Sequence, residues 1–294
     1  MKSMSTIRTR FFIPALALLV IIFAGIRLSY AEQTIQFAPL PMEKKDTMLS
    51  KFQPLTSFLS ERLKTKIEYT YTSNYATLLE KFANSEIDLT FLGPLPYVKL
   101  RKNFPAAEPI IFFKQSKDKA TYTCAIATFP DNHFDFFDGK LQKIGLTQPL
   151  STCGYLSANG LMKQHGNSLE NNLYRYLGAH DKVALAIIRG EVAAGGLKTE
   201  VAQKYEHLGL IILAETGPLP PFALVANTRT LKQETIDTII SSLLELDQML
   251  ADDTELTEHQ KKIIGKGFLR GNDSAYHIIR ELQGSVTIPE RGNY

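Results

Sequence analysis

The stretch that decides the fold runs from residue 143 to residue 156 and reads KIGLTQPLSTCGYL. Its first four residues are typical of a short buried strand, and the Pro-Leu-Ser-Thr that follows opens a helix. Unpaired backbone N–H groups and the positive end of the helix dipole make such a helix start favourable for an anion. Ser151 and Thr152 add hydroxyl donors, and Gly154 allows a ligand to approach the backbone. The same pattern also suits an ordinary helix cap, because Ser and Thr are preferred there without any ligand.

The change from a short apolar strand to a helical pattern repeats along most of the chain. Strand-like runs occupy residues 34–39, 66–72, 87–92, 109–114, 122–128, 143–146, 172–176, 192–195, 210–214 and 222–226. Helical spacing of apolar side chains occupies residues 47–63, 75–83, 95–101, 149–164, 180–189, 198–205 and 231–250, with further helical material to about residue 282. This alternation predicts an α/β fold of layered sheets and helices.

Two polar or proline-rich segments, residues 115–121 and 217–222, interrupt the pattern. We interpret them as two crossings between two α/β lobes, and a cleft between lobes is the usual place for a ligand. The expected division is a signal peptide at residues 1–31, the first part of lobe 1 at 32–118, lobe 2 at 119–220, and the completion of lobe 1 with C-terminal helices at 221–294.

The formal charge of +3 comes from the beginning of the chain. Residues 1–31 hold four basic side chains and no acidic one, which leaves 29 basic against 30 acidic side chains elsewhere. A positive start, an apolar run at residues 11–26 and small residues before position 32 are typical of a secretory signal, and we expect cleavage after Ala31. The alternative is an uncleaved anchor, but sixteen residues span only about 24 Å. We therefore expect a protein outside the cytoplasm, without stable membrane insertion and without nucleic-acid binding.

The two cysteines, Cys124 and Cys153, both lie in the expected mature part. A disulfide between them is possible in an oxidising compartment. Their surroundings differ, however, because one lies on a predicted strand and the other at a helix start. We therefore favour two free thiols.

The sequence contains no motif that supports catalysis or a cofactor. It has neither a Gly-x-Gly-x-x-Gly turn nor a Walker A loop, and no Gly-x-Ser-x-Gly elbow. Its six histidines show no close metal-ligand spacing. We expect neither an enzyme nor a protein with a metal or other cofactor, and the rival enzyme hypothesis would need a nucleophile and a base at the anion site.

Four stretches together resemble a known family. They are residues 52–55 (FQPL), 88–97 (DLTFLGPLPY), 151–156 (STCGYL) and 177–181 (LGAHD). In this order they are similar to segments of the periplasmic phosphate/phosphite/phosphonate-binding proteins of ABC transporters, over about residues 34–250. The resemblance implies a type II periplasmic binding protein, in which two α/β lobes close on a ligand.

The resemblance also implies a set of ligand-binding residues. The oxyanion site falls on the helix start at residue 151, with phenolic donors from lobe 1 and a histidine from lobe 2. The implied residues are Tyr75, Tyr97, Ser151, Thr152, Cys153, Gly154 and His180. Without the resemblance, a core-edge position is the commoner explanation for each tyrosine, and a solvated cap is the commoner explanation for the histidine.

Two departures from the family pattern bear on the ligand. Where the family often reads Val-Asp-Ala, this chain reads Val192-Ala193-Ala194, so an acidic partner for an aminophosphonate is missing. This favours a compact oxyanion such as phosphate, phosphite or a short alkyl phosphonate. Cys153 replaces the serine usual in the loop. It is either a near-isosteric replacement or a thiolate ligand for trivalent arsenic.

The resulting hypothesis is a monomeric, secreted solute-binding protein that delivers a small oxyanion to an ABC permease. The alternative is a periplasmic sensor that binds an oxyanion, arsenite or arsenate among them, and docks on the ectodomain of a histidine kinase.

Overall fold

The computed structural model describes residues 34–294, with gaps at 117–119, 138–139 and 253–255. The predicted signal peptide, residues 1–31, lies outside the described residues. Between residues 34 and 294, leaving those gaps aside, no helix combines the length and the apolar character needed to cross a membrane.

A first sheet contains the strands β1 (Ile35–Pro39), β2 (Ile67–Tyr69), β3 (Leu89–Leu92), β4 (Ala107–Phe113), β10 (Ala223–Asn227) and β11 (Phe268–Arg270). Their spatial order is β11-β4-β10-β3-β1-β2. The pairs of β1 with β2 and β3 are parallel, whereas β10 and β11 run antiparallel to their neighbours. The sheet is therefore mixed, and it combines segments from both ends of the described chain.

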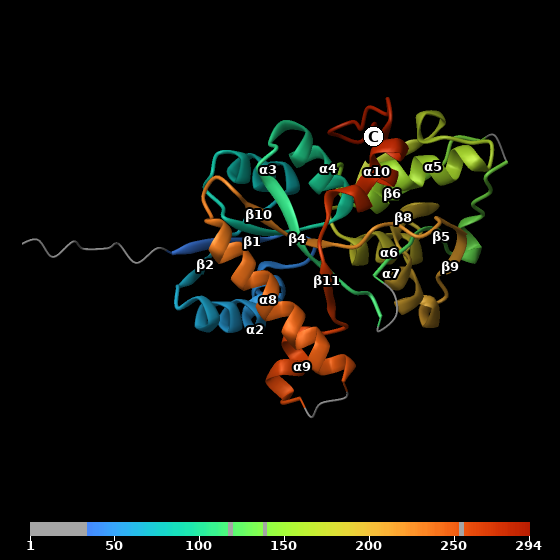
Figure 1. The fold of residues 1–294 in the computed structure, drawn as a ribbon. Helices are drawn as coiled ribbons and strands as arrows, with labels where there is room; N and C mark the ends of the chain where they lie inside the picture. Colours follow the sequence, from blue (N-terminus) through green and yellow to red (C-terminus); the bar gives the residue numbers. More distant parts are fainter. Residues whose placement is uncertain (1–33, 117–119, 138–139, 253–255) are drawn as a thin grey trace, which may run out of the picture. The chain divides into compact units, whose positions relative to one another are not determined.

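Helices cover both faces of this sheet. Figure 1 shows α3 and α4 on one face and α2 and α8 on the other. The bounds are α2 (Lys45–Leu63), α3 (Tyr75–Ala83), α4 (Pro94–Asn103) and α8 (Gln233–Ala251), followed by α9 (Glu258–Ile264), η5 (Asp273–Tyr276) and α10 (His277–Gln283). The start of α3 shows why a helix begins there, because the Asn74 side chain accepts a hydrogen bond from the Thr77 N–H at 2.9 Å.

A second sheet contains the strands β5 (Cys124–Thr128), β6 (Lys143–Leu146), β7 (Leu173–Tyr176), β8 (Ala194–Lys198) and β9 (Ile211–Glu215), in the order β7-β6-β8-β5-β9. Its helical elements are η1 (Pro130–Asn132), η2 (Thr152–Leu156), α5 (Ser157–Gln164), η3 (Leu169–Asn171), α6 (His180–Ile188), α7 (Thr199–Lys204) and η4 (Glu206–Leu208). Figure 1 shows α5 on one side of this sheet and α6 and α7 on the other. The two faces hold separate clusters of buried apolar side chains.

The chain passes between the sheets after β4 and again after β9, in the segments predicted as crossings. The two passing segments are paired with each other. Tyr122 and Leu219 form an antiparallel bridge. The Tyr122 N–H donates to the Leu219 carbonyl at 3.2 Å, and the Leu219 N–H donates to the Tyr122 carbonyl at 2.8 Å. A cavity lies against these paired segments, because Tyr122 is part of its wall.

The C-terminal part differs from the helical pattern expected there. The strand β11 interrupts it and pairs with β4 at the edge of the first sheet. The tail beyond α10 contacts the second sheet, where the Asn293 N–H donates to the Tyr174 carbonyl at 3.0 Å and the Tyr176 hydroxyl donates to the Pro289 carbonyl at 2.8 Å. The assignment of residues 32–118, 119–220 and 221–294 to two lobes stays a prediction.

Candidate functional site

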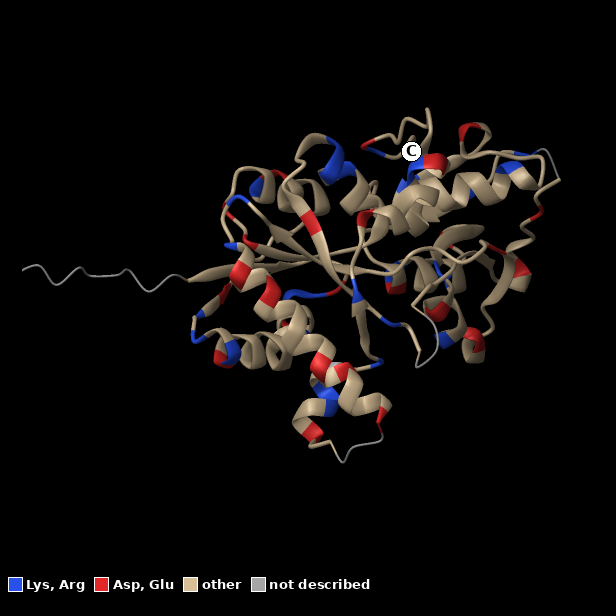
Figure 2. Cartoon of the chain, in the orientation of Figure 1, with Lys and Arg blue, Asp and Glu red and all other residues tan. Residues whose placement is uncertain are grey.

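A cavity of about 670 Å³ lies where elements of the two sheets meet. Its wall combines α2 and the start of α3 with η2, the start of α6 and the end of β8. Its charged side chains are Lys44, Lys51, Lys114, Lys198, Lys204, Lys262 and Lys266, together with Glu43, Asp181 and Glu200. Figure 2 shows basic and acidic segments interspersed on the helices. The described wall is nevertheless richer in lysine than in carboxylate, which favours an anionic ligand.

The predicted oxyanion site, residues 151–154 and called the anion loop from here on, contributes to this wall through residues 151–153. Ser151 and Thr152 are 5% and 4% exposed and both line the cavity. Residues Thr152–Leu156 form a turn that leads into α5, with a kink at Gly154 (φ −79°, ψ −123°), and Ser151 precedes it without making a side-chain cap. The first N–H groups of a helix have no partner in the preceding turn. The Ser151 N–H donates to the Gln148 carbonyl at 2.9 Å and the Gly154 N–H to the Ser151 carbonyl at 3.0 Å, so these two groups are taken. The Ser151 hydroxyl and the N–H groups of Thr152 and Cys153 are the donors that this turn can offer to an anion.

The thiol prediction is wrong. Cys124 and Cys153 form a disulfide, with an S–S distance of 1.99 Å and a Cα–Cα distance of 5.1 Å. The strand β5 and the turn η2 are far apart in the predicted pattern, but the order β6-β8-β5 brings them to the same region of the sheet. A sulfur in a disulfide is no thiolate, so the arsenic-ligand interpretation of Cys153 falls with it.

Glycine is required at Gly154 for packing. A Cβ atom there would lie 2.8 Å from the Gln148 carbonyl oxygen and 3.0 Å from Thr147 Oγ1. A Cβ atom at Gly196, on β8 below the turn, would lie 2.9 Å from the Cys153 carbonyl oxygen. The structure thus places Gly154 as the residue that lets the turn close, rather than as part of the cavity wall.

Tyr75 lines the cavity from α3, a helix that covers the first sheet. It is the first residue of α3 and is 4% exposed. Burial raises the pKa of its phenol, and the neighbouring Tyr122 raises it further. The hydroxyl therefore stays protonated at neutral pH and can act as a hydrogen-bond donor to an anion.

His180 lines the cavity at the start of α6. Its Nδ1 atom accepts the Lys198 backbone N–H at 3.0 Å, so the neutral ring carries its proton on Nε2. Burial and then the Lys198 ammonium lower its pKa to about 4, although Asp181 acts in the opposite direction. At neutral pH the ring is an uncharged donor.

Lys198, at the end of β8, supplies a partly buried cation that the sequence analysis did not identify. Its side chain is 18% exposed, and Nζ lies 2.6 Å from Gln115 Oε1 and 2.8 Å from Glu200 Oε2. Burial lowers the pKa of its ammonium group, and Glu200 counters this effect. The sequence does place a lysine at the end of an apolar strand, and lysine is seldom buried without a partner. That position could have indicated a paired lysine at the site.

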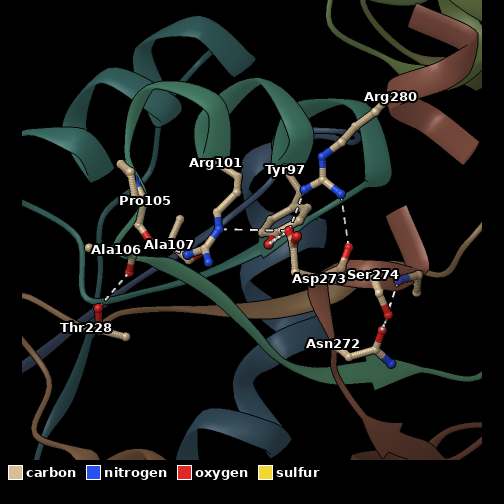
Figure 3. A network of polar contacts seen from close by, with 11 residues as sticks. Tyr97, Arg101, Pro105, Ala106, Ala107, Thr228, Asn272, Asp273, Ser274 and Arg280 are labelled. Atoms are coloured by element: carbon tan, nitrogen blue, oxygen red, sulfur yellow. Dashed lines mark hydrogen bonds and ion pairs between the residues drawn. The ribbon is translucent and has the colours of Figure 1, made fainter. Parts of the chain in front are cut away.

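Tyr97 lies elsewhere. It is fully buried in α4, and its hydroxyl donates to Asp273 Oδ1 at 2.5 Å. Figure 3 shows this contact together with Arg280, which also bonds to Asp273, and with Arg101. Burial raises the pKa of Asp273, but hydrogen bonds from Tyr97 and Arg280 outweigh it and leave the pKa lowered. The predicted role of Tyr97 as a donor to the ligand does not fit this arrangement.

Direct hydrogen bonds join the elements of the two sheets beside the cavity. The Leu95 N–H donates to Thr152 Oγ1 at 3.0 Å. Gln148 makes two such contacts, accepting from the Tyr75 N–H at 3.2 Å and donating to the Pro41 carbonyl at 3.0 Å. The anion loop is therefore held against the starts of α3 and α4.

The two-sheet architecture defines the class of the protein as a type II periplasmic binding protein, as predicted. The chain belongs to the family described as "ABC transporter, phosphonate, periplasmic substrate-binding protein", which matches residues 37–276. Proteins of this family are periplasmic, so the expected compartment agrees with the family.

The chain is also similar, at low sequence identity, to individual known proteins. The phosphate-import protein PhnD of Mycolicibacterium smegmatis is 27% identical over 175 residues, which are 55% of this chain and 54% of that protein. The match thus spans about half the length of that relative.

Two solved structures share the fold. PhnD1 from Prochlorococcus marinus, in complex with methylphosphonate, is 18% identical, with a TM-score of 0.75 and coverage of 86% of this chain and 98% of that chain. A binding-protein component of an ABC phosphonate transporter from Pseudomonas aeruginosa is 17% identical, with a TM-score of 0.71 and 86% coverage of both chains.

Proposed function

We propose that this protein binds a small phosphorus oxyanion, namely phosphate, phosphite or a short alkyl phosphonate, in the cavity between its two sheets and delivers it to an ABC permease. The observation that carries the proposal is the meeting of Ser151, Thr152 and His180 with Tyr75 in the wall of one cavity. Family membership supports the class of ligand.

The chemistry of the donors fits a deprotonated tetrahedral anion. Ser151 offers a hydroxyl, Tyr75 a protonated phenol, and His180 its Nε2–H, while the start of η2 offers the backbone N–H groups of Thr152 and Cys153. Hydrogen bonds to charged acceptors are stronger than those between neutral groups. The Lys198 ammonium adds a positive charge in a partly buried environment, where Coulomb attraction is larger than in water.

Binding between two lobes also explains how a permease would recognise the loaded protein. A ligand held by groups from both lobes binds the closed form more tightly than an open form, and it shifts the population by that difference in affinity. The contacts from Gln148 and Thr152 across the cavity edge are available only when the lobes are close together. The permease would then read the closed arrangement.

A thermal-shift panel tests the proposal. The panel contains phosphate, phosphite, methylphosphonate and 2-aminoethylphosphonate, with sulfate as the control anion. A ligand at 100 times its Kd stabilises the folded protein by about 2.7 kcal/mol, which corresponds to roughly 5–10 °C for a chain of this size. We expect such a shift for at least one of the first three compounds. No shift with any of them would overturn the proposal.

A further inference from the structure

The cavity is larger than a compact oxyanion needs. Phosphate and methylphosphonate each have five non-hydrogen atoms, which occupy on the order of 150 Å³ if each takes the volume of a water molecule. The cavity measures about 670 Å³. Cavities of this size ordinarily hold ligands with an organic body.

Part of the remaining wall is apolar and aromatic. Phe91 and Phe222 stack at 5.1 Å between ring centroids, and Phe52 lies 4.9 Å from Phe91. All three line the cavity. This wall offers contact to carbon atoms of a ligand rather than to its oxyanion.

The strand pairing fixes the direction of Lys198 relative to the anion loop. Lys198 lies directly opposite Cys124 in the antiparallel pair of β8 and β5. Opposed residues of such a pair project on the same face, with Cβ atoms about 5 Å apart. Because Cys124 is bonded to Cys153 of the anion loop, Lys198 also projects toward that loop.

The ammonium group of Lys198 lies beside the aromatic wall. Its Nζ is 6.0 Å from the ring centroid of Phe222 and 5.6 Å from that of Tyr122. Its carboxylate partner, Glu200, is shared with Lys266 at 3.3 Å. The three side chains together keep one positive charge, which a ligand group can neutralise.

Resting on the proposed function, we propose that the preferred ligand is a phosphonate or phosphate ester whose short organic body carries a carboxylate, with the phosphorus oxyanion at Ser151 and the carboxylate at Lys198. The apolar body lies along the Phe91 and Phe222 side of the cavity. A cationic substituent is disfavoured beside Lys198, because the ammonium group repels it and the nearest carboxylate, Glu200, is already paired with Lys198 and Lys266.

Isothermal titration calorimetry with matched ligands tests this inference. 3-Phosphonopropionate carries the carboxylate, propylphosphonate lacks it, and 2-aminoethylphosphonate carries a cation. Phosphonoacetate and phosphoglycolate then distinguish a C–P bond from a phosphate ester. We expect 3-phosphonopropionate to bind at least ~10-fold more tightly than propylphosphonate, as a charge-assisted hydrogen bond allows.

Variants of the lysine identify the group responsible. In Lys198→Met the affinity ratio of 3-phosphonopropionate to propylphosphonate should fall to near one, whereas Lys198→Arg should retain a preference. Lys182→Met, an exposed lysine on α6, removes the same charge away from the cavity and should keep the wild-type ratio. A thermal melt of each variant verifies folding.

The outcomes separate the two proposals. Equal binding of propylphosphonate and 3-phosphonopropionate by the wild type overturns the inference and leaves the proposed function intact. An unchanged ratio in Lys198→Met also overturns it. If none of the phosphorus compounds binds, the proposed function itself fails.

Discussion

Removing the disulfide gives a stability change that can be worked out from the chain. Cys124 and Cys153 are 29 residues apart in the sequence. In the chain-entropy treatment, a bond closing a loop of this length destabilises the unfolded chain by about 3.6 kcal/mol at 25 °C. For a chain of this size, that corresponds to a melting temperature about 7–14 °C lower in the double variant Cys124→Ala/Cys153→Ala.

Differential scanning calorimetry should compare three samples: the oxidised wild type, the wild type with a thiol reductant, and the double variant. The reduced wild type keeps both buried sulfur atoms, so it isolates the effect of the covalent bond. The variant also loses the packing of those atoms and should melt at or below the reduced wild type. A variant that melts within about 2 °C of the oxidised protein would refute the reasoning.

Four further changes test individual parts of the account. Ser151→Ala should weaken methylphosphonate binding by roughly 10–100-fold in calorimetry, through loss of a hydrogen bond to a charged acceptor, with little change in melting temperature. The pKa of His180 in the folded protein is about 4, below its usual 6.5, so the unfolded chain binds the proton more readily. The free energy of unfolding should therefore fall as the pH drops from about 6.5 to 4. Urea unfolding of His180→Gln should show a smaller fall over this pH range. Gly196→Ala should destabilise the protein by about 1–3 kcal/mol in urea and lower ligand affinity, because its Cβ would press on the turn below the ligand. Tyr97→Phe should cost about 1–2 kcal/mol of stability through its bond to Asp273 and leave ligand affinity at the wild-type value, whereas a loss of affinity would place Tyr97 at the ligand.

Periodicity was sufficient to predict elements whose pattern is local. The predicted bounds of the helix at residues 75–83 and of the strand at 143–146 agree with α3 and β6. The helix α3 begins with a side-chain cap, and the strand β6 is a short buried run. Each of these patterns is local and can be recognised in the sequence alone. The three-residue strand β11 was missed because a strand so short has no period of its own and is defined by its partner β4.

The features of the site that the sequence did not predict depend on contacts between residues far apart in the chain. The pairing of Cys124 with Cys153 depends on the order of β6, β8 and β5, which no local pattern shows. Lys198 was missed for the same reason, since its place beside the anion loop follows from its register with β5. Tyr97 was assigned to the ligand from a motif, but the direction of its hydroxyl is set by Asp273, far along the chain.

The central claim is that one cavity binds a phosphorus oxyanion, and calorimetric titration of the purified protein with methylphosphonate tests it most directly. We expect saturable binding with one ligand per chain, competition by phosphate or phosphite, and weaker binding by Ser151→Ala. Absence of binding heat with all three ligands at several temperatures, or binding that Ser151→Ala leaves unchanged, would contradict it.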